Sequence, residues 1–325
     1  MNKVNGLVVG AVLLTVTAGA RDASAASRTP VELGTLGGDQ SFARDVNACG
    51  QVVGESRTSA GETHAFLWRQ GAMRDLGTLG GPFSSANAIS ERGDVVGRSA
   101  LPDFAAFHAF LWADGRMTDL GTLPGRTFSE ALDINEEGRI VGQSDGQAVV
   151  WNRGRIAALD APGADVSFAA SINARGVVAG TASFGGSFHA VIWDRGVMRD
   201  LGTLGGGSSR ANGVNDRGQV VGSSDTASGS VHAFIWQDGV MSDLGSLAPD
   251  GFAAANALND GGVVVGEGTT VAGEEHGLLW AHGAIVDLLP LPGSTFSSAS
   301  SVNNGRDAVG VSFVGTGFRA VIWRN

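Results

Sequence analysis

The chain contains the stretch Asp75-Leu76-Gly77-Thr78-Leu79-Gly80-Gly81, followed by Gly93-Asp94-Val95-Val96-Gly97 and then by His108-Ala109-Phe110-Leu111-Trp112. Variants of this unit recur along the sequence, and each copy contains one tryptophan. The seven tryptophans are separated by 44, 39, 42, 43, 44 and 43 residues, at Trp68, Trp112, Trp151, Trp193, Trp236, Trp280 and Trp323. A regular period in this range is the signature of a repeat protein, in which each unit packs against the next.

Each unit divides into four short strands bounded by turn residues. In the copy quoted above we expect strands at Ser84–Ser90, Asp94–Ser99, His108–Trp112 and Met117–Leu123, which we designate a to d. An Asn-x-x-Gly turn between a and b suits a type I turn, because the asparagine side chain caps the turn and glycine adopts a positive φ. This turn recurs at Asn47/Gly50, Asn135/Gly138, Asn173/Gly176 and Asn215/Gly218.

The two ends of the repeat region complement each other. The first strand, Val31–Leu36, is of type d, and the last, Arg319–Trp323, is of type c. An open solenoid would leave an orphan strand at each end, whereas a ring would use both. We therefore predict an all-β fold, a seven-bladed β-propeller with four strands per blade. The N-terminal strand d would join the C-terminal strands a, b and c, in a single domain at residues 26–325.

Residues 1–25 have the pattern of a cleavable secretory signal peptide. Lys3 gives a positive start, Gly6–Ala20 is apolar, and Ala23-Ser24-Ala25 is a small-x-small cleavage motif. The apolar run is shorter than the roughly 20 residues that a membrane-spanning helix needs. We expect a secreted or periplasmic bacterial protein whose mature form is not inserted in a membrane.

The composition excludes several function classes. Removing Lys3, Arg21 and Asp22 from the 22 basic and 32 acidic residues leaves 20 against 31, a net charge of −11. This balance argues against nucleic-acid binding, which needs a basic face. The rest of the chain has no lysine or tyrosine and one cysteine, Cys49, which excludes Schiff-base and phenolic chemistry and a disulfide framework. We expect a monomer.

The motifs His-Ala-Phe-Leu-Trp and Asp-Leu-Gly-Thr-Leu-Gly-Gly resemble those of the bacterial extracellular HAF-repeat family over residues 31–323. The resemblance implies a repeat architecture and export, and it implies no particular activity. Gln147 and Arg319 replace the histidine in the third and seventh copies, and the fourth copy has Ala158–Pro162 in place of Leu-Gly-Thr-Leu. We expect these three copies to form irregular blades.

The repeated histidines could be metal ligands, but their spacing in the sequence argues against a metal site. Five histidines precede a tryptophan by four residues, at His64, His108, His189, His232 and His276. A zinc site needs three or four ligands around one point, whereas a residue found once per blade lies on a wide ring. We therefore predict no metal, no cofactor and no catalytic role. The histidines should be hydrogen-bonded, and so should the aspartates that recur once per copy, at Asp75, Asp119, Asp200, Asp243 and Asp287, with Glu32 as the first copy. The tryptophans should be core residues whose indole N–H has a hydrogen-bond partner.

Function is expected where the repeat varies. The d–a and b–c loops share one face, differ in length, and carry Phe83, Asp103, Phe104, Arg126, Asp165, Arg210, Asp250 and Glu274. Loops on a rigid scaffold are common recognition surfaces. We predict an exported, non-catalytic binding protein for a glycan or a protein. The alternatives are a carbohydrate-active hydrolase with two carboxylates at the channel mouth, a structural envelope or matrix component, and loops with no recognition role.

Overall fold

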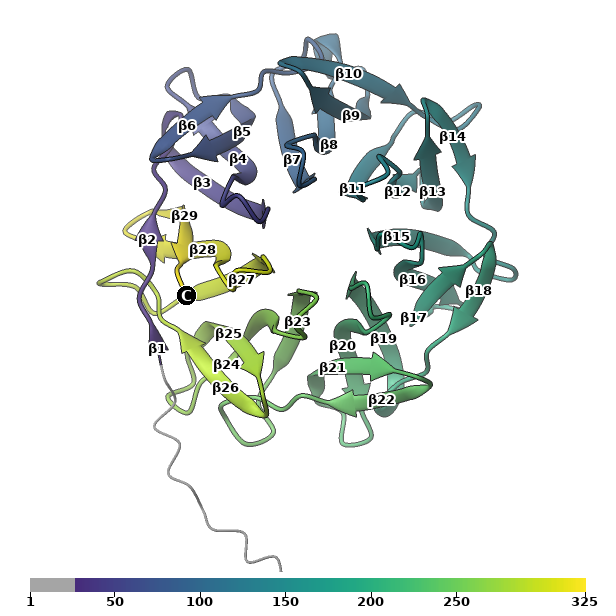
Figure 1. Cartoon of the computed structure of the whole chain (residues 1–325), viewed down its shortest axis with the longest axis vertical. Coiled ribbons are helices and arrows are strands. Elements are labelled where there is room, and N and C mark those ends of the chain that lie inside the picture. The colour runs from purple at the N-terminus through teal and green to yellow at the C-terminus, as the bar shows by residue number, and fades with distance from the viewer. Residues whose placement is uncertain (1–26) are drawn as a thin grey trace, which may run out of the picture.

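The computed structural model describes residues 27–325, so the predicted signal peptide lies outside the described residues. The chain forms seven sheets arranged in a closed ring around a central channel (Figure 1). In each blade the first strand borders the channel and the last strand lies on the circumference. The predicted all-β, seven-bladed propeller is confirmed.

The strands of the blades have the following bounds. Blade 1 contains β3 (Gly37–Val46), β4 (Val52–Thr58), β5 (Thr63–Arg69) and β6 (Ala72–Asp75); blade 2 contains β7 (Ser84–Ile89), β8 (Val95–Ala100), β9 (Phe107–Ala113) and β10 (Arg116–Gly121). Blade 3 contains β11 (Glu130–Ile134), β12 (Ile140–Ser144), β13 (Gln147–Asn152) and β14 (Arg155–Ala158); blade 4 contains β15 (Val166–Ile172), β16 (Val178–Phe184), β17 (Ser187–Asp194) and β18 (Val197–Asp200). Blade 5 contains β19 (Gly205–Val214), β20 (Val220–Thr226), β21 (Val231–Gln237) and β22 (Val240–Asp243); blade 6 contains β23 (Ala253–Leu258), β24 (Val264–Thr269), β25 (Glu275–Ala281) and β26 (Ala284–Leu288). Blade 7 contains β27 (Ser297–Val302), β28 (Ala308–Val314), β29 (Gly317–Trp323) and β2 (Val31–Glu32), and a short 3-10 helix, Pro102–Phe104, lies between β8 and β9.

Blade 7 closes the ring with a strand from the N-terminal end. β2 pairs antiparallel with β29, with Val31 opposite Ile322, and the Leu33 N–H donates to the Ala320 carbonyl at 2.9 Å. Leu33 itself is buried in a core cluster with Ile322 and Val309. The predicted closure is therefore confirmed.

A second N-terminal strand was not predicted. β1 (Ser27–Arg28) runs parallel to β26 and adds a fifth strand to blade 6. The Arg28 guanidinium donates to the carbonyl of Arg306 at 2.7 Å and to the Asn325 side chain at 3.1 Å. The N-terminal segment thus spans the outside of two blades.

The expectation of three irregular blades is wrong at the level of topology. The third, fourth and seventh units each form four strands in the same order as the others. In blade 3 a tight turn accommodates the shortened b–c connection, because both Asp145 and Gly146 adopt positive φ values of 44° and 76°. The departure from regularity lies instead in blade 6, with its extra strand.

The core lies between adjacent blades. Each tryptophan is at most 8% exposed, and four indole N–H groups donate to a carbonyl of the preceding blade, as for Trp151 to Leu120 at 3.0 Å. Strand a of every blade carries a β-bulge, opposite a glycine in strand b. A side chain at that glycine, Gly97 for example, would place its Cβ 2.0 Å from the Ser85 carbonyl oxygen. The bulge, which brings two backbones together, therefore explains the glycine that recurs at this position of strand b.

Candidate functional site

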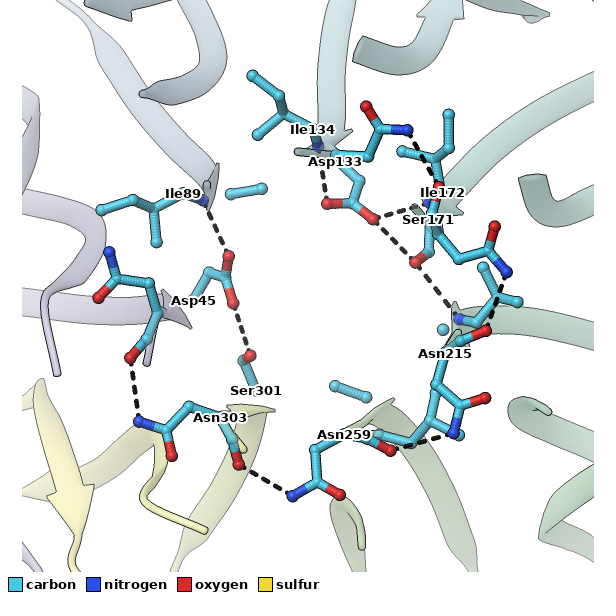
Figure 2. A pocket seen from close by; sticks show the side chains of 18 of the residues that line it. Asp45, Ile89, Asp133, Ile134, Ser171, Ile172, Asn215, Asn259, Ser301 and Asn303 are labelled. Carbon is cyan, nitrogen blue, oxygen red and sulfur yellow. Dashed lines mark hydrogen bonds between the residues drawn. The ribbon is translucent and has the colours of Figure 1, made fainter. Parts of the chain in front are cut away.

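Asparagines of the a–b turns join neighbouring blades around one end of the channel (Figure 2). The Asn303 amide donates to the Asn47 carbonyl of blade 1 at 3.0 Å, across the closure of the ring. Equivalent bonds of 2.9–3.2 Å link five more pairs of blades, from Asn47, Asn135, Asn173, Asn215 and Asn259. The predicted turn is confirmed, since Gly50 adopts φ 70° and its N–H bonds the Asn47 carbonyl. The inter-blade role was not predicted.

Two carboxylates line the channel wall two residues before these asparagines. Asp45 accepts hydrogen bonds from the Val46 N–H, from the Ile89 N–H of blade 2 and from the Ser301 hydroxyl of blade 7. Asp133 accepts hydrogen bonds from the Ile134 N–H and, from blade 4, the Ile172 N–H and the Ser171 hydroxyl. Both carboxylates therefore tie their blade to the next one.

Burial in the channel wall raises the pKa of both carboxyl groups. The pKa of Asp133 rises from 3.8 to about 7, and that of Asp45 is also raised. Raised carboxyl pKa values are typical of general acids, although hydrogen-bonded structural groups also have them. Here protein donors already occupy both oxygens of each group, which leaves these carboxylates poorly placed to contact a substrate.

Further carboxylates stand around the channel on the turn side, in a cavity of about 500 Å³. They come from the a–b turns, at Glu91, Glu136, Asp216 and Asp260, and we call them the acidic ring. Each accepts a backbone N–H of the preceding blade, as Glu91 does from Ala48 at 2.8 Å. Burial, with smaller contributions from nearby carboxylates, raises the pKa of Glu91. These groups are also inter-blade ties.

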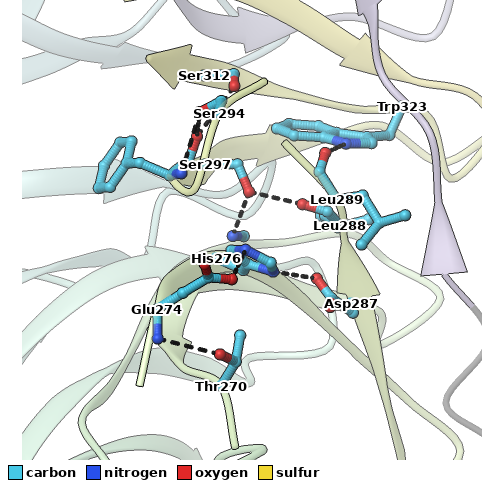
Figure 3. A network of polar contacts seen from close by, with 12 residues as sticks. Thr270, Glu274, His276, Asp287, Leu288, Leu289, Ser294, Ser297, Ser312 and Trp323 are labelled. Atoms are coloured by element: carbon cyan, nitrogen blue, oxygen red, sulfur yellow. Dashed lines mark hydrogen bonds and ion pairs between the residues drawn. The ribbon is translucent and has the colours of Figure 1, made fainter. Parts of the chain in front are cut away.

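The repeated histidines pair with the repeated aspartates of their own blade. In blade 6 the His276 Nδ1 lies 2.9 Å from Asp287, and its Nε2 lies 3.5 Å from Glu274 (Figure 3). The other four pairs have Nδ1–carboxylate distances of 2.6–2.9 Å. In four of these blades the aspartate also accepts the N–H of a glycine two residues later. The predicted hydrogen bonding is confirmed, and blade 7 replaces the pair with Arg319 and Glu32 at 3.2 Å.

The face formed by the d–a and b–c connections, which we call the loop face, carries two aromatic clusters. In blade 2, Phe107 lies 5.7 Å from Phe83 and 6.1 Å from Phe104 between ring centroids. The Arg98 guanidinium lies over the rings of Phe83 and Phe107 at 5.6 and 5.9 Å. The cluster therefore places tilted and edge-to-face aromatic rings beside a guanidinium group.

The second cluster joins blades 7 and 1. Phe318 lies 5.1 Å from Phe42, 5.2 Å from Phe313 and 5.8 Å from Phe296. A pocket of about 170 Å³ lies between the two clusters, with walls formed by Gln40, Phe42, Glu55, Ser56, Arg57, Thr63 and Phe83. We call this pocket and the two aromatic clusters the loop-face groove. It combines aromatic faces with carboxylate, guanidinium, amide and hydroxyl groups.

The structure brings only two of the eight predicted ligand residues together, Phe83 and Phe104, which both contact Phe107. Glu274 lies against His276, and Arg210 stacks 3.9 Å from the ring centroid of Phe188. The remaining four are exposed and dispersed over different blades, at Asp103, Arg126, Asp165 and Asp250. Asp165 accepts the N–H of Gly185 across its own blade at 2.9 Å.

Sequence reasoning missed Phe42 and Arg57, which lie in strands a and b of blade 1. Arg57 occupies a position where the other copies carry different residues, such as Ala100 in blade 2, whereas Phe42 has an equivalent phenylalanine, Phe168, in blade 4. A comparison of non-repeating residues within strands, and not only within loops, would have found Arg57.

Three observations concern other types of site. Within residues 27–325, no group of three or more histidine, cysteine, aspartate or glutamate side chains is arranged to hold a metal ion. In the same part of the chain no helix is long and apolar enough to cross a membrane. Cys49 is exposed and unpaired in its turn.

The chain matches no protein-family model and no curated protein. Among solved structures it resembles a puromycin-hydrolysing peptidase of Mycobacterium tuberculosis, with a TM-score of 0.59 and 16% identity, over 84% of this chain and 48% of the peptidase. The chain thus spans about half the length of that enzyme. A gluconolactonase from Xanthomonas campestris matches with a TM-score of 0.43 and 17% identity, over 90% of this chain and 91% of the gluconolactonase. TolB from Acinetobacter baumannii matches with a TM-score of 0.46 and 11% identity, over 73% of this chain and 65% of TolB. At these identities the likeness to the peptidase concerns the propeller fold alone.

Proposed function

We propose that this protein is an exported, non-catalytic binding protein that recognises a glycan in the loop-face groove. The observation that carries the proposal is the placement of Phe42 and Phe83 on either side of a small polar pocket. Sugar rings present C–H faces that pack on aromatic rings and hydroxyls that bond to polar groups, so such a pocket suits one sugar of a longer chain.

The positions of the carboxylates support binding over hydrolysis. A glycosidase needs two carboxyl groups that flank the substrate. The two channel carboxyls, Asp45 and Asp133, are engaged by backbone and serine donors of neighbouring blades. The alternative, a hydrolase with Asp133 as proton donor, rests on its pKa of about 7. Export rests on the signal pattern at residues 1–25, and membership of the HAF-repeat family on the repeated motifs.

The test is a glycan array probed with residues 26–325 and with a groove variant, Phe42→Ser with Phe83→Ser. A matched control, Val197→Ser with Val240→Ser, removes two exposed apolar side chains from outer strands. We expect the parent and the control to bind the same glycans, and the groove variant to bind at least about tenfold more weakly, because buried aromatic anchors dominate such sites. Thermal unfolding of each variant checks that the fold is retained.

Two results would overturn the proposal. If no glycan binds, the ligand class is wrong, and a protein ligand or a structural role takes its place. If bound glycans are cleaved, as measured by new reducing ends, the protein is a hydrolase, and loss of cleavage in Asp133→Ser would identify the acid.

A further inference from the structure

The opposite face of the propeller is formed by the a–b and c–d turns. Along one side of its outer rim lie seven arginines. We call these seven residues the arginine arc. They lie in the c–d turns and outer strands of blades 1 to 4, at Arg69, Arg74, Arg116, Arg153, Arg155, Arg195 and Arg199, and all are exposed. The equivalent segments of blades 5 and 6, Gln237–Asp243 and Ala281–Leu288, contain no arginine, and in blade 7 Arg324, at the position of Arg69, pairs with Asp307. In Figure 1 the outer strands of the arc, β6, β10, β14 and β18, follow one side of the circumference.

The arginines of the arc lack acidic partners within the protein. Among residues 27–325, only Arg195 has a carboxylate within 4.0 Å, that of its neighbour Asp194. By contrast, Arg44 and Arg57 of blade 1 pair with Glu55 and Asp39 at 3.0 and 3.3 Å. The aspartates that end the outer strands are engaged by histidines. The guanidinium N–H groups of the arc are therefore available to external acceptors.

Two members of the arc are held in place by the next blade. The Arg74 guanidinium lies 5.2 Å from the ring centroid of Trp112, and that of Arg199 lies 5.1 Å from Trp236. Stacking on an indole fixes the guanidinium and lowers the entropy lost when it binds an anion. These two guanidinium groups are therefore preorganised for binding an anion, unlike surface arginines that move freely.

The shape of the arc restricts the partner. A flat anionic membrane would also meet the acidic ring at the centre of the same face, and like charges there would repel it. A thin, flexible polymer can follow the rim across four blades and avoid the centre. We propose that the arginine arc binds a linear anionic polysaccharide, whose carboxylate or sulfate groups pair with successive guanidinium groups. This surface is separate from the loop-face groove and does not depend on it.

The test measures binding of residues 26–325 to polygalacturonate and to dextran sulfate, with neutral dextran as the uncharged reference. An arc variant carries Arg116→Ser, Arg153→Ser and Arg155→Ser. A matched control on the same face carries Arg139→Ser, Arg175→Ser and Arg217→Ser, which lie in a–b turns and remove the same charge. We expect the parent and the control to bind both polyanions in a salt-sensitive manner, and the arc variant to bind roughly tenfold more weakly.

Several outcomes would overturn the inference. They are absence of polyanion binding at low salt, equal loss in both variants, and tighter binding to phosphatidylglycerol vesicles or to single-stranded DNA. The groove variant Phe42→Ser/Phe83→Ser should keep full polyanion binding. If it loses polyanion binding while the arc variant keeps it, the polyanion binds the loop face and the arc proposal is wrong, whereas the proposed function would stand.

Discussion

Replacing Asp133 should change how the stability of the ring depends on pH. The folded protein raises the pKa of this carboxyl from 3.8 to about 7, because the channel wall buries it. The folded state therefore holds a proton that the unfolded state releases, and stability should be greatest below about pH 4 and fall as pH rises through about 7. A pKa difference of this size corresponds to a loss of about 4 kcal/mol in the free energy of unfolding. About two-thirds of this loss falls above pH 5, and channel solvent screens the partly exposed side chain, so we expect a loss of about 2 kcal/mol between pH 5 and pH 8.

The substitution Asp133→Ser tests this reasoning with a residue that the protein already uses at the equivalent position. Ser171 of blade 4 accepts the Val214 N–H of blade 5 through its hydroxyl at 3.3 Å. The variant should lose the part of the pH dependence that Asp133 contributes between pH 5 and 8. Glu137→Ser, an exposed acid of the same blade, is the control for net charge and should retain the parent's pH dependence.

The assay is urea unfolding of parent and variants at pH 5, 6, 7 and 8. The difference in unfolding free energy between Asp133→Ser and the parent should grow in favour of the variant, by about 2 kcal/mol from pH 5 to pH 8. If this difference stays constant over the pH range, Asp133 does not titrate as argued, and the case for its buried, proton-holding state fails.

Three further predictions concern the construction of the ring. Deleting Thr29–Leu36 should lower the unfolding free energy by at least about 3 kcal/mol in urea unfolding, because it removes the closing strand and its buried leucine; a truncated chain as stable as the parent would contradict the closure. Asn259→Ala should cost about 1–2 kcal/mol, because it removes the inter-blade donor to the Asn303 carbonyl and the side-chain acceptor of the Val263 N–H. Ser90→Asn should increase the melting temperature by adding the one inter-blade amide bond that blade 2 lacks. His108→Arg and Asp119→Glu should each lower the free energy of unfolding by about 1 kcal/mol. In a double-mutant cycle the double variant should recover part of this loss, because blade 7 uses an Arg–Glu pair at the same position. Additive losses would show that the two pairs are not interchangeable.

The blade and its closure could be predicted because both are encoded in short-range patterns. Strand c contains a tryptophan at or next to its last residue in every copy, and turn residues mark the hairpins. Closure followed from the complementary ends, Val31–Leu36 and Arg319–Trp323. β1 could not be predicted in this way, because Ser27–Arg28 has no strand pattern and pairs with residues distant in the sequence, Asp287 and Leu288 of β26.

The candidate site was less accessible to sequence reasoning. Phe42 and Phe83 lie 41 residues apart, and only the packing of blade 1 against blade 2 brings them to one pocket. The second role of the turn asparagines was hidden for a similar reason. The turn requires only the side-chain oxygen, whereas the amide nitrogen of Asn303 reaches a carbonyl 256 residues away in the sequence.

The most direct test of the binding account is hydrogen exchange of residues 26–325 with and without the glycan that binds best on the array. Exchange should slow in the two loops that border the pocket, residues 59–62 and 76–83, and stay unchanged in the a–b turns at residues 47–51 and 135–139. Slowing confined to those turns, or to the outer rim of blades 1 to 4, would place the ligand on the other face and contradict recognition in the loop-face groove.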